Sequence, residues 1–384
     1  MNYNVKLYLK NNADNINLAA AAILLLALPL SESLKNISLY LFMVPIFFYN
    51  LYNGSLRIKM TALHYGFLLI LLVSCAAAFF SENKYESIKG IRDVLRNTVT
   101  FFVFHGFCKK RDVNLLLWAF FISTGAVSAY GIYNSLLTHS VLSIPALGHY
   151  NYTAMYLIIS ATAMLSMFVY GERGGKAETV ILFTLIFITL AASVMTTMRT
   201  SFVALALFIV ILLLWKKNTR KSILIIVFFT PMVLTVLYLY KPMWSKLLST
   251  ESLIHRIEIW KYAFTVFKDN FLTGVGLNNF NFSLPPHMDG GRAVYDAHSL
   301  YLNTAVQTGI FGITSLILII YGFLKTWVSF KALSSYEKTV KYGALGAFLV
   351  IFIGGLFDTT FHHKQGMEFA ILSAVMAACS YELE

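Results

Sequence analysis

A single histidine and several arginines are the residues in this chain whose types and positions could support chemistry. His298 lies in the run Asp296-Ala297-His298-Ser299-Leu300, directly before a long apolar stretch. An imidazole has an ordinary pKa of about 6.5, so a neutral histidine suits the role of general base at neutral pH. We expect neighbouring arginines to lower this pKa and keep the imidazole neutral. The alternative is a histidine that sits satisfied at a membrane interface.

Arginines accumulate on the same predicted side of the chain as His298. Arg199 stands in a very short turn between two apolar stretches, where a charged group is costly and usually has a partner. The planar guanidinium fork suits phosphate oxygens, so several arginines and few acidic residues on this side, Arg199 and Arg256 among the arginines, suggest a diphosphate ligand. Further substrate contacts are expected from Arg92, Arg96 and Arg292. For Arg199, simple snorkelling of the side chain to the interface is the alternative.

The acidic residues on this side favour a reaction without a metal. They contain no Asp-x-Asp pair, whereas a Mg²⁺ or Mn²⁺ site needs clustered carboxylates. His362-His363 is an adjacent pair without an evident third ligand, which is a weak metal signal. We therefore expect charge neutralisation by arginine, with no metal and no cofactor.

Tyrosines and one asparagine are candidates for binding the substrate. Tyr150 and Asn151 begin one apolar stretch, and Tyr301 follows His298 closely. Tyrosine rings there could stack on sugar faces, but an aromatic belt at a membrane interface explains them equally well.

The elements that must position these residues are transmembrane helices. The chain has 384 residues, of which 58% are hydrophobic and only 12% charged, and its mean hydropathy is +0.68. Its apolar runs are long and continuous, which favours helices over a barrel. We predict an all-α, polytopic membrane protein with one transmembrane domain over residues 1–384. We count about twelve spans, near 17–31, 34–52, 61–80, 93–108, 114–137, 151–170, 178–197, 200–215, 221–240, 297–324, 341–357 and 367–381.

Lysine and arginine placement predicts how the chain is oriented. The net charge is +12, and about 17 basic residues fall in alternate loops that include Lys109-Lys110-Arg111 and Lys216-Lys217. The positive-inside rule then puts both termini in the cytoplasm and His298 outside, in the periplasm if the membrane is an inner membrane. Basic residues in inside loops account for most of the excess charge, so nucleic acid is not expected as a partner.

One long polar segment, residues 241–296, is predicted to face outward as a periplasmic loop. From Leu253 to Phe267, apolar residues recur at steps of four and three, which predicts one helical stripe. Such a helix would lie at the membrane interface or cap the bundle, and Gly274-Val275-Gly276 would end it.

Three stretches of the sequence resemble the O-antigen ligase and polymerase superfamily of the bacterial envelope. They are Arg199-Thr200-Ser201, then Arg256 to Trp260 with Gly274-Val275-Gly276-Leu277, and finally His298 to Leu302 with Gly309 and Gly312. The resemblance implies a membrane glycosyltransferase similar to the GT-C type. It also implies that Arg199 and Arg256 contact a lipid-linked diphosphate and that His298 is the base.

The function implied by this resemblance is that of an O-antigen ligase in lipopolysaccharide biosynthesis. The donor would be a glycan on undecaprenyl diphosphate, held from the membrane lipid, and the acceptor a hydroxyl of lipid A-core oligosaccharide. Direct displacement would invert the anomeric centre. An O-antigen polymerase, which joins repeat units, is the nearest alternative, and a transporter of lipid-linked sugars is the second. A transporter would be expected to show internal repeats and charges at mid-bilayer.

Overall fold

The computed structural model describes residues 3–54, 56, 58–171, 175–215, 251–283, 296–361 and 363–381. Every regular element in these ranges is a helix. The elements are α1 (Tyr3–Ala27), α2 (Glu32–Asn36), the π-helix η1 (Ile37–Met43), α3 (Val44–Tyr52), α4 (Ala62–Phe80), α5 (Lys84–Phe107), η2 (Lys110–Asp112), α6 (Val113–Thr138), α7 (Tyr150–Tyr170), α8 (Lys176–Met195), α9 (Arg199–Trp215), α12 (Glu251–Asp269), η3 (Phe280–Ser283), α13 (Leu300–Ser329), α14 (Ser335–Gly354) and α15 (His363–Tyr381).

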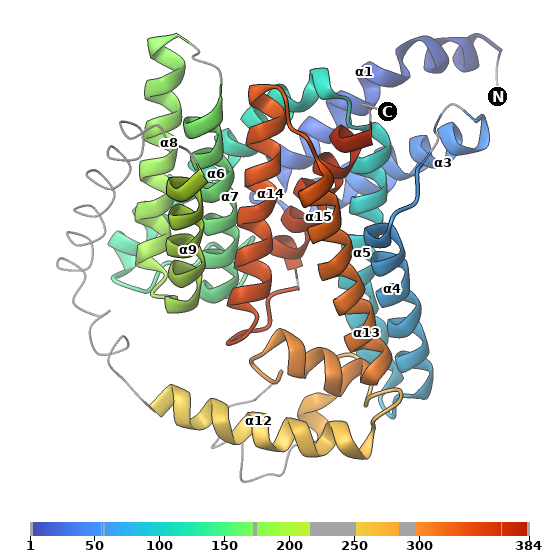
Figure 1. The fold of residues 1–384 in the computed structure, drawn as a ribbon, viewed down its shortest axis with the longest axis vertical. Coiled ribbons are helices and arrows are strands. Elements are labelled where there is room, and N and C mark those ends of the chain that lie inside the picture. The colour runs from blue at the N-terminus through green and yellow to red at the C-terminus, as the bar shows by residue number, and fades with distance from the viewer. Residues whose placement is uncertain are drawn as a thin grey trace.

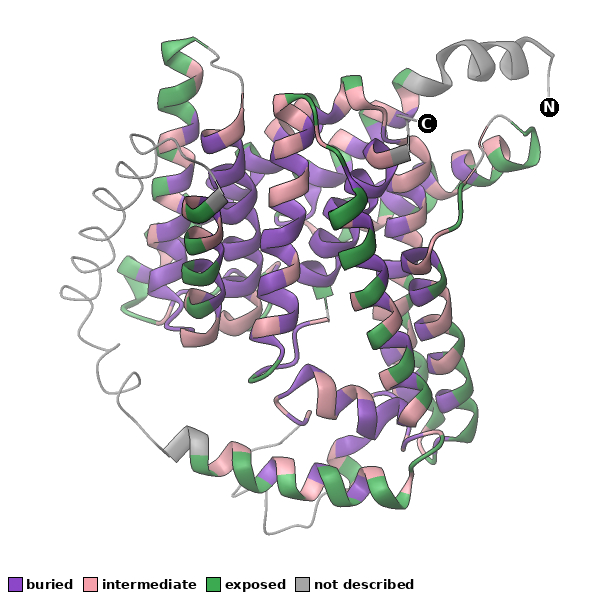
Figure 2. Cartoon of the chain, in the orientation of Figure 1, coloured by how far each residue is buried: buried purple, intermediate pink, exposed green. Residues whose placement is uncertain are grey.

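The long helices form a bundle, with α7 near its centre. Helix α7 packs against α14 and α8, α4 packs against α13 and α5, and α15 packs against α5 (Figure 1). Almost every residue of α7 is buried, whereas the outer helices expose large apolar side chains (Figure 2). An apolar rim around a buried centre is the pattern expected of a bundle that sits in lipid.

Six helices in the described ranges are long and apolar enough to cross a membrane. They comprise Glu32–Tyr52, Ala62–Phe80, Lys110–Thr138, Tyr150–Tyr170, Lys176–Met195 and Leu300–Ser329. The protein is therefore a multi-pass, all-helical membrane protein, as the composition predicts. The number twelve is not established, because several of the predicted spans carry charged residues or are short, and the predicted span 221–240 lies outside the described residues.

Helix α12 confirms the helix predicted from Leu253 to Phe267 and crosses one end of the bundle (Figure 1). The face that it buries is not the predicted stripe. Ile259, Ala263 and Val266 are buried, while Ile257 and Phe264 are 46% and 49% exposed. The helix has two apolar faces, and the sequence period alone does not tell which face meets a neighbour. The inner face packs on a small cluster that includes Phe280, Ala297 and Val306.

A kink in α13 explains the glycines that stand before and after His298 in the sequence, in Gly274-Val275-Gly276 and at Gly309. Gly309 adopts φ +66° and ψ −160° inside α13, a conformation that favours glycine. The kink frees backbone groups, so Val275 N donates to Val306 O at 2.9 Å and Ile310 N donates to Phe271 O at 2.9 Å. At Gly274, which has φ +68°, a Cβ atom would lie 2.4 Å from the backbone carbon of Gln307. The segment after α12 is thereby fixed against the helix that follows His298.

Candidate functional site

His298 stands immediately before α13 and has an unusual backbone conformation. Its φ is +46°, in the left-handed region that costs energy for a residue other than glycine. Its amide donates to Oδ1 of Asp296 at 2.8 Å. Two residues later, Leu300 N donates to Gly355 O at 2.8 Å and to Asp358 O at 3.1 Å. The start of α13 is therefore tied to the turn 355–358, which follows α14.

Two carboxylates face Nδ1 of His298. Oδ1 of Asp296 lies 3.5 Å from this nitrogen, and Oδ1 of Asp358 lies 4.0 Å from it. The side chain of Asp358 is only 5% exposed, and its position is set by hydrogen bonds from Asn151 Nδ2 at 2.7 Å and from the Thr359 amide at 2.8 Å. A histidine with carboxylates at Nδ1 has its Nε2 left for a substrate proton, and the imidazolium that forms is stabilised.

The pKa of His298 shifts in the opposite direction to our expectation. Burial opposes the charged imidazole, but the carboxylates of Asp358 and Asp296 beside Nδ1 outweigh it, so the pKa is raised. Arg256 lowers the pKa, as predicted, but it does not decide the balance. The prediction was wrong because it counted only the arginines and missed two carboxylates that meet the ring in the fold. A raised pKa makes His298 a stronger base, although a smaller fraction is neutral at a given pH.

Arg256 reaches the same turn from α12. Its Nη1 donates to the carbonyl oxygen of Phe357 at 2.6 Å, one residue before Asp358. On the other side of the turn, Ser299 Oγ donates to Gly355 O at 3.4 Å. Residues 355–358 thus join the arginine and the histidine, which are 42 residues apart in the sequence. The remaining guanidinium N–H groups are suited to a phosphate oxygen beside the base.

Arg199 begins α9, at the end of the bundle where α14 finishes and α12 crosses (Figure 1). It is half-buried. Within the described part of the chain it forms no hydrogen bond or ion pair with His298, Arg256 or Asp358. The structure therefore brings Arg199 to the site end of the bundle without a direct contact to the other two.

Arg96 is engaged by carboxylates of the protein itself. It forms ion pairs with Glu32, at 3.0 Å, and with Asp93. Glu32 also pairs with Lys35 at 2.6 Å and with Lys364 at 3.1 Å, which makes a charged network between α2, α5 and α15. The guanidinium of Arg96 is therefore already bound by carboxylates of the protein. Its expected role as a direct substrate contact stays a prediction.

The other predicted substrate contacts have different positions. Arg92 is exposed on α5, and its Nε donates to Lys89 O at 3.5 Å. Asn151 donates to Asp358, and so belongs to the immediate surroundings of His298. The ring of Tyr150 lies 3.8 Å from that of His149, while Tyr301 Oη donates to Phe352 O at 2.8 Å. Arg292 and His362 lie outside the described residues.

A polar cavity of about 490 Å³ opens beside His298. The described residues that line it are Glu86, Asp93, Tyr152, Asn278, Asn281, Phe282, Asp296, Gln307 and His363. Asp296 connects it to the histidine, because the same carboxylate lies 3.5 Å from Nδ1. Within the described ranges, no three histidine, cysteine or acidic side chains are grouped so as to hold a metal ion.

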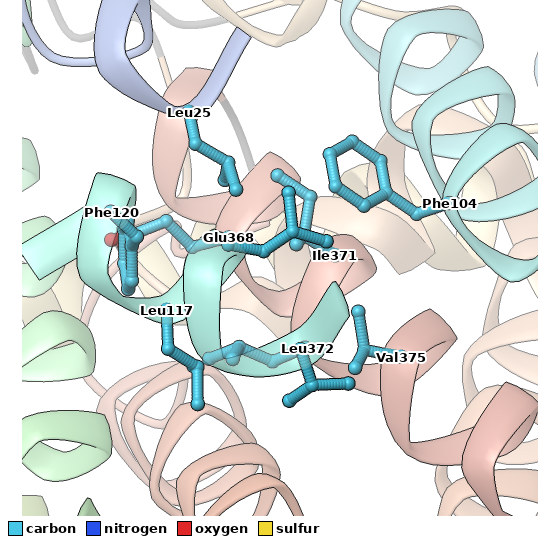
Figure 3. A pocket seen from close by; sticks show the side chains of 10 residues that line it. Leu25, Phe104, Leu117, Phe120, Glu368, Ile371, Leu372 and Val375 are labelled. Atoms are coloured by element: carbon cyan, nitrogen blue, oxygen red, sulfur yellow. The ribbon is translucent and has the colours of Figure 1, made fainter. Parts of the chain in front are cut away.

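A second cavity lies deep in the bundle and has a different character (Figure 3). It measures about 20 Å³, room for roughly one water molecule. Apolar side chains line it together with Glu368, which extends toward Phe120 and accepts a hydrogen bond from Ser160 Oγ at 2.7 Å. Its size and apolar lining do not suit a glycan.

Sequence reasoning missed the importance of two acidic residues. The spacing of Asp296 and His298, two positions apart, was a local signal that both could belong to one site. Asp358 follows His298 by 60 positions, and nothing near it in the sequence indicates that it meets an imidazole.

Comparison with known families agrees with the resemblance noted in the sequence. Residues 183–317 match a family model described as O-antigen ligase, so this part of the chain is similar to the O-antigen ligase and polymerase superfamily. Arg199, Arg256 and His298 all fall within the matched region, and Asp358 falls outside it. The family supports a glycosyl-transfer role of the ligase or polymerase type in lipopolysaccharide biosynthesis. No curated protein matches the chain.

Proposed function

We propose that this protein is an O-antigen ligase, which transfers a glycan from undecaprenyl diphosphate to a hydroxyl of lipid A-core oligosaccharide. One observation carries the proposal: the turn 355–358 joins His298, with its two carboxylates, to the guanidinium of Arg256. This arrangement supplies a proton acceptor and a phosphate-binding cation side by side. Those are the two groups that displacement of a diphosphate by a hydroxyl requires.

The reaction begins with the acceptor hydroxyl at Nε2 of His298. As Nε2 takes the proton, the hydroxyl oxygen attacks the anomeric carbon of the donor glycan. The bond from this carbon to the diphosphate oxygen breaks, and its electron pair leaves with the diphosphate. Attack from the face opposite the leaving group inverts the anomeric centre.

Arginines stabilise the charge that develops on the diphosphate. Arg256 is placed beside the base, and Arg199 supplies a second cation from the start of α9. Fixed cations aimed at developing charge need no reorganisation during the reaction, which is why such groups contribute strongly to catalysis. Asp296 and Asp358 stabilise the imidazolium until it releases its proton. No step in this scheme needs a metal ion.

The proposed location is the periplasmic face of the inner membrane. Lys110 of η2 and Glu337 near the start of α14 form an ion pair at 3.0 Å, at the end of α14 opposite the turn 355–358. The basic loop 109–111 is therefore at the other end of the bundle from His298. By the positive-inside rule this distribution supports a cytoplasmic basic end and a periplasmic site.

Deleting the gene and examining lipopolysaccharide on a gel tests the proposal. Bare lipid A-core, with long glycan accumulating on the undecaprenyl carrier, is the result expected for a ligase. Core that bears a single repeat unit would instead identify a polymerase. Complementation with the wild-type gene should restore the gel bands of lipopolysaccharide that carries long glycan. Complementation with a His298→Ala variant, at an equal protein level in the membrane, should not restore them. Full restoration by His298→Ala would remove this residue as the base.

A further inference from the structure

The polar cavity beside His298 has the composition of a sugar-binding site. Three of its described lining residues carry carboxylates, three carry amides, and two, Tyr152 and Phe282, are aromatic. No described lysine or arginine lines it. Cavities of about 300–1,000 Å³ are of the size that holds small ligands, and this one measures about 490 Å³.

Each carboxylate of the cavity has a basic partner outside the described lining residues, and Asp93 also lies 3.7 Å from Nδ1 of His363, which lines the cavity. Glu86 pairs with Lys89 at 2.6 Å, Asp93 pairs with Arg96, and Asp296 lies 3.5 Å from His298 Nδ1. These partners restrict the orientation of each carboxylate. The cavity therefore presents fixed hydrogen-bond acceptors.

Two amides add acceptors that the protein leaves unused. Oδ1 of Asn281 is buried and has no hydrogen-bond partner among the residues that the structure describes. Gln307 is only 4% exposed, and its Nε2 donates to Asn303 Oδ1 at 3.3 Å, while its Oε1 accepts no hydrogen bond from the described residues. Buried polar atoms almost always have partners, so Asn281 Oδ1 calls for a donor on a ligand.

Aromatic groups form a platform in the same cavity. The rings of Tyr152 and His363 lie 4.9 Å apart, and Phe282 is 59% exposed. Tyr152 follows Asn151, which holds Asp358, so the platform and the base are positioned by the same turn of α7. Flat rings beside polar acceptors match a pyranose, which has both C–H faces and hydroxyl donors.

We propose that this cavity binds the acceptor sugar and that it selects a sugar without negative charge. The inference rests on the proposed function. Hydroxyl groups, or an amino group, would donate to the carboxylates and to the free amide oxygens. An acidic sugar or a phosphate would meet three carboxylates, and charge repulsion of this kind rejects a wrong partner. The diphosphate of the donor therefore lies on the Arg256 side of His298, and the acceptor lies on the Asp296 side.

Asp296 connects the proposed sugar-binding cavity to the proposed base, His298. It lines the cavity, accepts a hydrogen bond from the His298 amide and faces Nδ1. A sugar that reaches Asp296 lies next to the imidazole. An uncharged terminal sugar could belong to the core oligosaccharide or to the end of a repeat unit, and the chemistry of recognition is the same.

Saturation-transfer NMR on the purified full chain in nanodiscs tests the proposal without relying on transfer. Methyl β-glucoside and methyl β-glucuronide differ only at the carboxyl group. We expect saturation of the glucoside to exceed that of the glucuronide at least fivefold. In the Glu86→Gln variant the ratio of glucoside saturation to glucuronide saturation should fall to half or less of the wild-type ratio. Glu178 is a carboxylate on α8 outside the cavity, so the Glu178→Gln variant should keep the wild-type ratio. Equal binding of both sugars, or a preference for the glucuronide, would overturn the proposal.

A competition arm identifies the source of the sugar. Displacement of methyl β-glucoside by delipidated core oligosaccharide supports an acceptor from the core, and displacement by one repeat unit supports an acceptor from the glycan chain. Displacement by neither overturns the assignment of the cavity to the acceptor. The proposed function and the proposed acceptor cavity can be tested separately. The His298→Ala variant should lose transfer but keep glucoside binding. Transfer by a wild-type protein that binds no glucoside would reject the cavity while leaving the proposed function intact.

Discussion

Oδ1 of Asp358 lies 4.0 Å from Nδ1 of His298, although α13 and α14 separate the two residues in the sequence. The carboxylate is almost fully buried and is held by Asn151 and by the Thr359 amide. A fixed carboxylate at Nδ1 orients the imidazole and stabilises its charged form. In the proposed mechanism, this pair is what makes His298 a competent base.

Replacing Asp358 with Asn should strongly reduce transfer without unfolding the protein. The amide keeps the shape and one hydrogen bond but no longer stabilises the imidazolium. We expect the transfer rate to fall by about 100-fold or more, since loss of the carboxylate in comparable histidine–carboxylate pairs costs up to about 10⁴-fold. Radiolabelled glycan transfer by purified protein measures this. A rate within a factor of two of wild type would contradict the role of Asp358.

The pH dependence of transfer should report the raised pKa of His298. The base must be neutral, so the rate should fall as the pH drops through a pKa above the ordinary value of about 6.5. In Asp358→Asn this acid limb should move to lower pH, because the largest contact that raises the pKa is removed. A pH series on both proteins measures the shift. An acid limb that stays in place in the variant would show that Asp358 does not set the pKa.

The same shift predicts how stability changes with pH. A group whose pKa is raised on folding stabilises the protein fully below its unfolded pKa, and that contribution is lost as the pH rises through the folded pKa. The thermal stability of wild type relative to His298→Gln should therefore decrease as the pH is raised across this interval. Differential scanning fluorimetry measures the difference. A constant difference across pH would argue against a charged His298 in the folded state below this interval.

Arg256→Lys should impair transfer because it keeps the charge but removes the planar fork. Lysine would lose the hydrogen bond to Phe357 O or the contact to phosphate, since one ammonium cannot reproduce both geometries. We expect a fall in rate of about 10- to 100-fold. The reverse exchange Lys261→Arg, at an exposed position on the same helix, is the matched control and should have little effect. A wild-type rate in Arg256→Lys would count against bidentate phosphate recognition.

Gly309→Ala should destabilise the protein at the kink of α13. The added Cβ would lie 2.2 Å from Leu272 O, and alanine disfavours φ +66° with ψ −160°. Strain of this kind costs about 1–3 kcal/mol, so the midpoint of thermal unfolding should fall by several degrees. Gly175→Ala is the control, because its Cβ would meet open space. Equal midpoints for the two variants would mean that the kink is not a stabilising feature.

A chelator should leave transfer nearly unchanged. The proposed mechanism neutralises the leaving diphosphate with arginines and routes no step through a metal ion. Transfer should be measured before and after incubation with EDTA, with Mg²⁺ and Mn²⁺ added back in separate samples. Strong inhibition by EDTA that the added ions reverse would indicate a metal-dependent mechanism.

The sequence by itself determined the class of the fold and indicated the residues at which we propose that the chemistry begins. Long apolar runs dictate membrane helices, because lipid leaves no other way to satisfy backbone groups. The apolar period from Leu253 to Phe267 predicted the helix that became α12. The residue types of His298 and Arg256 predicted a base and a phosphate contact. All of these follow from properties local to a stretch of chain.

Only the tertiary structure decided what surrounds those residues. A helical period tells which face is apolar but not which neighbour covers it, and in α12 Ile259, Ala263 and Val266 are buried while Ile257 and Phe264 of the predicted stripe are exposed. Contacts between distant segments carry no local signal, which is why Asp358 was missed and the pKa of His298 was expected to fall when it rises. Arg96, predicted as a phosphate contact, is paired with Glu32 and Asp93 for the same reason. The pKa of a side chain depends on every charge within a few ångströms, and folding is what brings those charges together.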